Sequence, residues 1–249
     1  MSISIVTGAA SGIGRSVAVH QANLGFTVFA MDIDDSGLLE TKQKSSGDIR
    51  ILTCDVSDPK SIANSFKVID EAGLEINSFI AVAGIGLYEK FEDMTLDQLI
   101  RVINVNLIGV LEPARYAYQR MNSGSSMVFV ASIMATHSLF NSVAYSATKA
   151  AVVAAARTLA LEAGEKGIRV NSVSPGTIDT PMLSRDLAFM NRSEQAEFIS
   201  KVNAANALGK IGSPEEVANL ISFLVSENAS YVTASDYRVD GGFGSLKKF

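Results

Sequence analysis

The stretch IVTGAASGIG, residues 5–14, joins the end of an apolar run to the start of a helical pattern. Its glycines, Gly8, Gly12 and Gly14, allow a tight turn and a close approach of the backbone to a phosphate group. The helix that follows offers unpaired N–H groups and the positive end of its dipole to the same phosphate. A glycine-rich turn between a strand and a helix therefore predicts a dinucleotide-binding α/β fold.

An acid ends the next apolar run: Asp32, in FAMDIDD, residues 29–35. A carboxylate at the end of a second strand is placed to accept hydrogen bonds from both hydroxyls of an adenosine ribose. It would repel the 2′-phosphate of NADP by on the order of 4 kcal/mol per pair of like charges, at ~4 Å and an effective dielectric of about 20. We therefore predict NAD as the cofactor. Arg15 could in principle bind a phosphate, but we interpret it as a solvated arginine in the first helical turn.

Short β-rich runs alternate with longer helical patterns along the chain. Strands are predicted at 2–6, 27–31, 49–54, 78–83, 126–132, 168–174 and 235–239, and helices at about 12–24, 35–45, 59–73, 95–121, 144–163 and 214–226. Strands that are apolar on both faces and alternate with helices indicate a parallel sheet with helices on both sides. An amphipathic segment at about 181–213 interrupts the rhythm after a strand end, where open sheets bind ligands, and is predicted to be a substrate lid.

The composition limits the partners and the compartment. The net charge is −5 and no basic run is longer than the Lys247-Lys248 pair, which argues against nucleic acid or an anionic membrane as partner. No apolar run approaches the ~20 residues needed to span a bilayer, and MSISIVTGAA at the start has no signal-type basic region or cleavage site. The single cysteine, Cys54, fits a reducing compartment, so we expect a cytoplasmic protein. His20, His137 and Cys54 are far apart in sequence and predict no metal site.

The stretch AYSATKAAVVAAA, residues 144–156, is an apolar helical pattern that nevertheless carries Tyr145 and Lys149. Residues four apart share a helix face. A free tyrosine has a pKa of ~10, and an adjacent ammonium favours the phenolate and lowers that pKa. Alone, such a pair is usually a packed ring and a solvated amine. Next to a dinucleotide turn it indicates a general acid/base, because groups of this kind cluster at active sites.

Several motifs in one order resemble those of the short-chain dehydrogenase/reductase family. They are Thr7-Gly8-x-x-x-Gly12-x-Gly14, Tyr145-x-x-x-Lys149 with Ser132 thirteen residues before the tyrosine, CDV (54–56), INVNLIGV (103–110), RVNSVSPGTIDTPM (169–182), and GSPEEVANLISFLVSENASYVT (212–233) with VDGG (239–242). The resemblance covers essentially the whole chain. It implies a single-domain Rossmann fold over residues 1–249, with a seven-stranded parallel sheet of order 3-2-1-4-5-6-7 and helices on both faces.

The resemblance also implies roles for particular residues. Tyr145 would exchange a proton with the substrate oxygen, Lys149 would lower its pKa and hold the nicotinamide ribose hydroxyls, and Ser132 would donate a hydrogen bond to the substrate oxygen. Asn106 would anchor a water that links Lys149 to solvent. The cofactor-binding positions implied are Gly8, Ser11, Gly12, Ile13, Gly14, Asp32, Ile33, Asp55, Val56, Ala83, Gly84, Tyr145, Lys149, Pro175, Gly176, Ile178 and Thr180.

One motif departs from the family pattern. After the fourth strand the family usually has Asn-Asn-Ala-Gly, whereas this chain has Ala81-Val82-Ala83-Gly84. The missing amide side chains would have bonded to neighbouring backbone, so we expect another group or a water to satisfy those partners. We expect the change to affect local stability more than catalysis.

The residues expected around the substrate are mostly apolar. They are Ser132, Met134, His137, Leu139, Tyr145 and Gly176, with Phe140, residues 86–88 and the lid nearby. A hydrophobic secondary alcohol or ketone, open-chain or cyclic, fits this lining. Arg185 and Arg192 on the lid either bind an anionic tail of the substrate or are solvated helix charges.

These patterns together predict an NAD(H)-dependent oxidoreductase that interconverts a secondary alcohol and a ketone. Two alternatives stay open: an NADH-dependent ketoreductase of the 3-oxoacyl type working in synthesis, and a non-catalytic dinucleotide sensor, which we would expect to lack Tyr145 or Lys149. Members of the resembled family are commonly homotetramers. The apolar helices at 95–121 and 144–163 therefore predict a homotetramer, or a homodimer, paired through these helices.

Overall fold

The computed structural model describes residues 2–243, so the Lys247-Lys248 pair lies outside the described residues. The described chain forms one sheet of parallel strands in the order β3-β2-β1-β4-β5-β6-β7, which confirms the predicted fold class and strand order. The strands are β1 (Ser2–Thr7), β2 (Thr27–Asp32), β3 (Ile49–Thr53), β4 (Glu75–Ala81), β5 (Met121–Val130), β6 (Arg169–Pro175) and β7 (Asp236–Val239).

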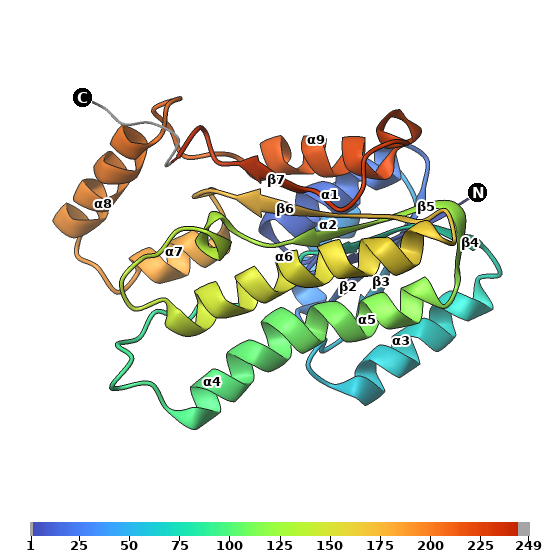
Figure 1. The fold of residues 1–249 in the computed structure, drawn as a ribbon, viewed down its shortest axis with the longest axis horizontal. Helices are drawn as coiled ribbons and strands as arrows, with labels where there is room; N and C mark the ends of the chain where they lie inside the picture. The colour runs from blue at the N-terminus through green and yellow to red at the C-terminus, as the bar shows by residue number, and fades with distance from the viewer. Residues whose placement is uncertain (1, 244–249) are drawn as a thin grey trace.

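Helices cover both faces of the sheet, as Figure 1 shows. The helices are α1 (Gly12–Asn23), α2 (Asp35–Gln43), α3 (Pro59–Glu71), α4 (Leu96–Ile103), α5 (Gly109–Tyr118), α6 (Val143–Gly164), α7 (Pro181–Leu187), α8 (Arg192–Ala205) and α9 (Pro214–Val225). Helices α3, α5 and α6 pack on one face, and α1, α2 and α9 pack on the other. None of the helices in residues 2–243 has the length and apolar character needed to cross a bilayer.

The strands supply both cores because their side chains alternate between the two faces. In β1, Ile5 packs against α3, α5 and α6, while its neighbour Val6 packs on the side of α1, α2 and α9. In β2, Phe29 and Ala30 divide in the same way. Both faces are covered, so the strands must be apolar at nearly every position, and this continuous apolar character made them visible in the sequence.

The chain crosses from the β3 edge back to β4, so β1 is flanked by β2 on one side and β4 on the other. In open sheets of this kind, ligands bind at such a switch point, beyond the carboxyl ends of the strands. The glycine-rich turn follows β1, and the Ala83-Gly84 pair follows β4. Both therefore lie at the switch point.

The helix predicted at 95–121 is interrupted in the structure. A π-helical turn, η1 (Asn104–Ile108), separates α4 from α5, and the helix ends at Tyr118. A single π-helical turn hardly changes the spacing of the apolar residues, so the sequence pattern did not reveal it. Such turns are frequent at functional sites, and this one carries the buried Asn106.

Two strands also begin earlier than predicted. Strand β4 runs over Glu75–Ala81 rather than 78–83, and β5 starts at Met121 rather than 126. In β5, Met121 pairs with Ile76, and regular pairing resumes at Ser126 opposite Ser78, so the register shifts between these two pairs. Polar strand ends carry no alternation of apolar residues, which is why the sequence did not place them.

Candidate active site

The four residues predicted to be catalytic lie close to the carboxyl ends of β4 and β5. Ser132 follows β5 directly and is the N-cap of a short 3₁₀ helix, η2 (Ile133–Ala135). Tyr145 and Lys149 lie on the first two turns of α6, and both are buried, with 7% and 4% of their surface exposed. Asn106 is completely buried in η1. The structure thus brings together residues from three separate segments of the chain.

The Lys149 ammonium points back toward the end of the sheet. Its Nζ donates a hydrogen bond to the carbonyl oxygen of Val130, at 2.9 Å, and lies 5.8 Å from the centre of the Tyr145 ring. A Cβ atom added to Gly84 would lie 3.5 Å from this Nζ and 3.3 Å from Oδ1 of Asn106. Gly84 therefore keeps open the space beside the lysine and the asparagine.

The Asn106 side chain is fixed by the protein on both of its ends. Its Oδ1 accepts a hydrogen bond from the backbone N–H of Ile85 at 2.8 Å, and its Nδ2 donates to the Ile85 carbonyl at 2.9 Å. Nδ2 also lies 3.4 Å from Oγ1 of Thr148, on α6. The amide thus ties the end of β4 to the helix that carries Tyr145 and Lys149. Its predicted water-anchoring role stays a prediction.

The pKa of Tyr145 moves in the direction opposite to our prediction. Burial raises the pKa of the phenol; hydrogen bonding with Ser132 opposes this effect, and the charge of Asp186 adds to it. Burial also lowers the pKa of Lys149 to about 8. Excluding water strengthens the attraction between the ammonium and a phenolate. The same exclusion penalises each charged form, and that penalty is the larger effect here.

Replacement of Lys149 by Met is expected to stabilise the folded protein at neutral pH. The folded pKa of about 8 lies below the ordinary 10.5, so below pH 8 folding must bury a protonated amine. At about 1.36 kcal/mol per pKa unit this burial costs ~3 kcal/mol. Loss of the hydrogen bond to Val130 offsets about 1 kcal/mol of that gain, so the free energy of unfolding should rise by roughly 2 kcal/mol at pH 7.

The pH dependence makes this prediction specific. Between pH 8 and 10.5 the unfolded chain keeps the lysine proton that the folded protein has lost, so the stability of the wild type rises through this window. The advantage of Lys149→Met should shrink over the same range. Urea unfolding at pH 7 and pH 10 measures both effects, with the exposed Lys201→Met as the matched control. A variant that is less stable than the wild type at pH 7 contradicts the prediction.

The glycine-rich turn leaves the space that a phosphate needs. Gly8 and Gly12 have φ angles of 69° and 51°, in the region that favours glycine. A Cβ added to Gly14 would lie 1.9 Å from the carbonyl oxygen of Gly8, and one on Gly8 would lie 2.6 Å from the backbone nitrogen of Ala83. All three positions therefore require glycine, and the start of α1 stays open to a ligand. These residues fit a dinucleotide, whose phosphates are bound by such helix N-termini.

Asp32 is oriented by the backbone at the end of β2. Its Oδ2 accepts a hydrogen bond from the N–H of Ala10 at 3.0 Å, and its Oδ1 accepts one from the N–H of Asp34 at 3.1 Å. Each carboxylate oxygen has a further lone pair, so both can still accept a hydroxyl proton. The carboxylate is half-buried. This donor and acceptor chemistry fits the ribose of a dinucleotide.

Arg15 is not the solvated arginine that we predicted. Its guanidinium forms an ion pair with Glu40 at 2.9 Å and donates hydrogen bonds to Oγ1 of Thr41 and to the carbonyl oxygens of Gly37 and Ala10. It therefore ties the glycine-rich turn to α2. These partners occupy Nε and Nη2 of the guanidinium, which makes Arg15 less available to a 2′-phosphate.

The other predicted cofactor positions lie in the loops after the strands. Asp55 and Val56 follow β3, Ala83 and Gly84 follow β4, Pro175 ends β6, and the residues after it lead to α7. A Cβ added to Gly12 would lie 3.1 Å from Cγ2 of Thr180, so the start of α1 meets this last loop directly. The remaining predicted positions in these loops and at the start of α1 are Ser11, Ile13, Ile33, Gly176 and Ile178.

Thr7 bonds to the backbone of the segment in which the family usually has its two asparagines. Its Oγ1 accepts hydrogen bonds from the N–H groups of Val82 and Ala83, at 3.1 and 3.3 Å. The expectation that another group or a water satisfies the partners of the missing amide side chains stays a prediction. The family motif begins at Thr7, but its spacing gave no sign of this contact.

The residues predicted to line the substrate pocket differ in exposure. Met134 is buried, His137 is half-buried, and Leu139 is exposed. The Tyr88 ring, from the predicted segment 86–88, lies 5.9 Å from the Tyr145 ring. Its loop is held to the Leu139–Ser142 segment by a hydrogen bond from the Glu89 N–H to the carbonyl of Asn141, at 2.8 Å.

The lid segment forms helices α7 and α8, and it brings one residue to the site that the sequence analysis missed. This residue is Asp186, on α7. A Cβ added to Gly86 would lie 3.6 Å from its Oδ1 and 3.0 Å from Cε2 of Tyr88. The neighbouring Arg185 is exposed and donates from Nε to the carbonyl of Pro181 at 3.2 Å. Nothing in the spacing of the lid distinguished Asp186 from a solvated acid.

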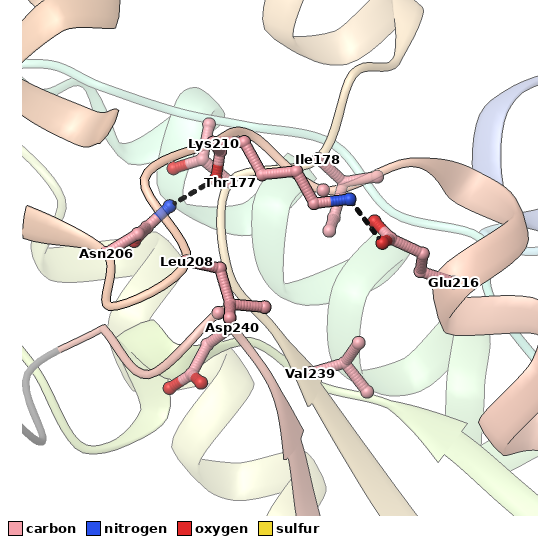
Figure 2. Close-up of a pocket in the computed structure, with 10 residues that line it drawn as sticks. Thr177, Ile178, Asn206, Leu208, Lys210, Glu216, Val239 and Asp240 are labelled. Atoms are coloured by element: carbon pink, nitrogen blue, oxygen red, sulfur yellow. Dashed lines mark hydrogen bonds and ion pairs between the residues drawn. The ribbon is translucent and has the colours of Figure 1, made fainter. Parts of the chain in front are cut away.

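A cavity of about 110 Å³ lies behind the loop after β6, where the chain returns from the lid (Figure 2). It is lined by Thr177, Ile178, Asn206, Leu208, Lys210, Gly212, Glu216, Val239, Asp240 and Gly241. An ion pair between Lys210 and Glu216, at 2.5 Å, spans it, and Asn206 donates to the Lys210 carbonyl at 2.7 Å. None of the four predicted catalytic residues lines this cavity, but Ile178, a predicted cofactor-binding position, does.

The comparisons with known proteins agree with the fold. The chain matches the family model described as enoyl-(acyl carrier protein) reductase over residues 8–244. It is 34% identical to a cyclohexanol dehydrogenase of Acinetobacter sp. (strain SE19), covering 98% of this chain and 95% of that relative. It is 32% identical to an uncharacterized short-chain type dehydrogenase/reductase of Sinorhizobium fredii over 99% of this chain, and it spans 44% of that relative's length.

A solved structure, the ligand-free aldohexose dehydrogenase AldT of Thermoplasma acidophilum, superposes with a TM-score of 0.89 at 31% identity. The match covers 100% of this chain and 96% of that chain. The fold and these similarities define a dehydrogenase/reductase of a class that uses nicotinamide cofactors. The chain belongs to the short-chain dehydrogenase/reductase family.

Proposed function

We propose that this protein interconverts a secondary alcohol and a ketone with NAD(H), using Tyr145 as the general acid/base. One observation carries the proposal: Tyr145 and Lys149 are buried together behind Ser132, at the sheet edge that also holds the glycine-rich turn. Perturbed ionisable groups next to a dinucleotide cradle are typical of a catalytic site. A protein that only senses a dinucleotide has no need for this buried pair.

Each residue then has a chemical task. The Ser132 hydroxyl accepts a hydrogen bond from the N–H of Met134 at 3.1 Å and interacts with the Tyr145 hydroxyl, so its own proton would turn from Tyr145 to the substrate oxygen when a substrate binds. Burial keeps Tyr145 in its neutral form near pH 7, ready to give its proton to a carbonyl oxygen or, as phenolate, to take one from an alcohol. When bound, the nicotinamide supplies or accepts the hydride.

Lys149 would hold the nicotinamide ribose in this proposal. Its ammonium has three donors and uses one on Val130, so two are left for the ribose hydroxyls. A cation held there also favours the phenolate during oxidation. Asp32 would hold the adenosine ribose and select NAD over NADP. Its charge is not balanced by Arg15, which is paired elsewhere.

The substrate class follows from the pocket and from the relatives. One relative is a cyclohexanol dehydrogenase and one structural neighbour is an aldohexose dehydrogenase, so both names refer to an alcohol. A cyclic secondary alcohol fits the buried Met134 and the ring of Tyr88. A ketoreductase of the 3-oxoacyl type is the second candidate. The acyl-carrier description of the family model and the exposed Arg192 on the lid favour it.

We further propose that the enzyme is a cytoplasmic homotetramer, or homodimer, paired through α4, α5 and α6. Large apolar side chains are exposed on α4, on α6 and on η1, the turn between α4 and α5: Leu96, Ile100, Ile108, Val143 and Leu161. Contiguous exposed apolar side chains mark an interaction surface. The single cysteine and the net charge of −5 support a reducing compartment and a small-molecule substrate.

A panel of secondary alcohols tests the proposed function. Each alcohol is incubated with the protein and NAD⁺, and NADH is followed by its absorbance; the corresponding ketones are incubated with NADH in the reverse assay. We expect cyclic secondary alcohols to be oxidised and 3-oxoacyl thioesters of an acyl carrier (β-ketoesters) to be poor substrates. A preference for the β-ketoesters would favour the ketoreductase, and binding of NADH without turnover of any substrate would favour the sensor.

A further inference from the structure

The lid helix α7 directs a carboxylate toward the candidate active site. Asp186 reaches the space over Gly86, where its Oδ1 would lie 3.6 Å from an added Cβ. Its charge raises the pKa of both Tyr88 and Tyr145. These two rings are 5.9 Å apart. Three polar groups from three segments thus converge where the substrate would bind.

This carboxylate has no hydrogen-bond or ion-pair partner within the part of the chain that the structure describes. Across residues 2–243, the structure contains neither a hydrogen bond to the Asp186 side chain nor an ion pair with it. The adjacent Arg185 is turned toward Pro181. Burial raises the pKa of Asp186, and only the charge of Arg185 opposes this. Neither oxygen of this half-buried carboxylate is closed off from solvent, so both are free to accept a hydrogen bond from a bound molecule.

We propose that Asp186 selects substrates that carry a second hydroxyl group near the reacting alcohol, and that its carboxylate accepts a hydrogen bond from that hydroxyl. The inference rests on the proposed function and narrows its substrate class to polyhydroxylated alcohols. We take the donor to be neutral, because the buried Lys149 ammonium, 5.8 Å from the centre of the Tyr145 ring, already supplies a positive charge near the site. A substrate carboxylate is disfavoured, since it would face the charge of Asp186.

The proposal alters the expectation of a purely apolar pocket. Met134 and the aromatic rings still provide apolar walls. The lid adds one acceptor to them, and a ligand pocket with apolar walls takes its specificity from such single polar groups. The polar group sits on the segment that would cover the substrate, so a matching hydroxyl would also help to hold the lid over the site.

Matched substrates and variants test the role of Asp186. The probes are cyclohexanol, the 1,2-, 1,3- and 1,4-cyclohexanediols, 2-aminocyclohexanol and 4-hydroxycyclohexanecarboxylate, each assayed with NAD⁺ and with NADP⁺. The wild type should prefer its best diol over cyclohexanol by at least ~10-fold in kcat/KM, as a hydrogen bond to a charged group predicts. Asp186→Leu should lower that ratio at least ~10-fold. Asp186→Asn, which keeps an acceptor oxygen, should lower it less and should improve the use of the carboxylate.

The control variant is Glu197→Gln, which removes an exposed carboxylate from the neighbouring lid helix α8 and should leave the ratio unchanged. Thermal unfolding shows whether each variant is folded. If Asp186→Leu does not fold, the test depends on Asp186→Asn. An unchanged ratio in the folded Asp186 variants, or a wild-type preference for cyclohexanol or for the amino alcohol, overturns the role of Asp186 alone. A wild type that oxidises none of the probes contradicts the proposed function itself.

Discussion

Replacement of Tyr145 by Phe should lower kcat at least ~100-fold while changing the Kd of NADH by less than about threefold. The phenol proton is the one that must move to or from the substrate oxygen, and a positioned acid/base contributes typically 10²–10⁴-fold, on the order of the loss we expect. The aromatic ring stays in place, so its packing near Tyr88 and Lys149 is preserved. Tyr145→Phe therefore removes mainly the phenol proton and with it the proton transfer.

The measurement is turnover of the best alcohol from the panel, together with a fluorescence titration of NADH. The matched control is Tyr118→Phe, which deletes a phenol on α5 whose hydroxyl donates to the Glu162 carbonyl at 3.4 Å, at the far end of α6. This control should keep wild-type kinetics. If Tyr145→Phe also keeps them, the acid/base assignment is wrong.

The sheet could be predicted because its physical cause acts on every residue of a strand. Covering both faces demands apolar side chains throughout, and the helices between strands need a different period, so the alternation is visible along the whole chain. The glycine positions could be predicted for a similar reason. Gly14 leaves no room for a Cβ against the Gly8 carbonyl, so the turn cannot form with another residue there.

Features that depend on one contact could not be predicted. The π turn at Asn106 and the early start of β5 at Met121 change the local geometry without changing the apolar pattern. Arg15 was predicted to be a solvated residue because its partners Glu40 and Thr41 lie on α2, which is distant in sequence. The proximity of Asp186 to the site could not be predicted, because it depends on how α7 packs over Gly86.

The pKa of Tyr145 shows a different limit. The sequence placed Lys149 beside it correctly, and the 5.8 Å distance between Nζ and the ring agrees with that placement. The direction of the shift depends on how deeply both groups are buried, and burial cannot be read from the spacing of two residues. Burial raises the pKa of the phenol and lowers that of the amine, so each group is held toward its neutral form.

The wild-type protein should bind NADH at least ~100-fold more tightly than NADPH. The Asp32 carboxylate is fixed by the N–H groups of Ala10 and Asp34, so it cannot swing away from a 2′-phosphate. Like charges ~4 Å apart repel by on the order of 4 kcal/mol at an effective dielectric of about 20, which corresponds to ~1000-fold before salt screening. Screening at physiological salt reduces this value, and hence we expect at least ~100-fold.

Asp32→Asn should reduce the preference for NADH at least ~10-fold, because it removes the charge and keeps the shape of the side chain. Affinity for NADPH should rise through the loss of repulsion, and affinity for NADH should fall because an amide has one acceptor oxygen where the carboxylate had two. The control is Asp34→Asn, which removes an exposed charge two residues away that caps α2 through the N–H of Gly37. Titration of each protein with NADH and NADPH separates local from long-range charge effects. Tighter binding of NADPH by the wild type would overturn the role given to Asp32. We do not expect Arg15 to offset the repulsion between Asp32 and a 2′-phosphate, because its guanidinium is paired with Glu40 and Thr41.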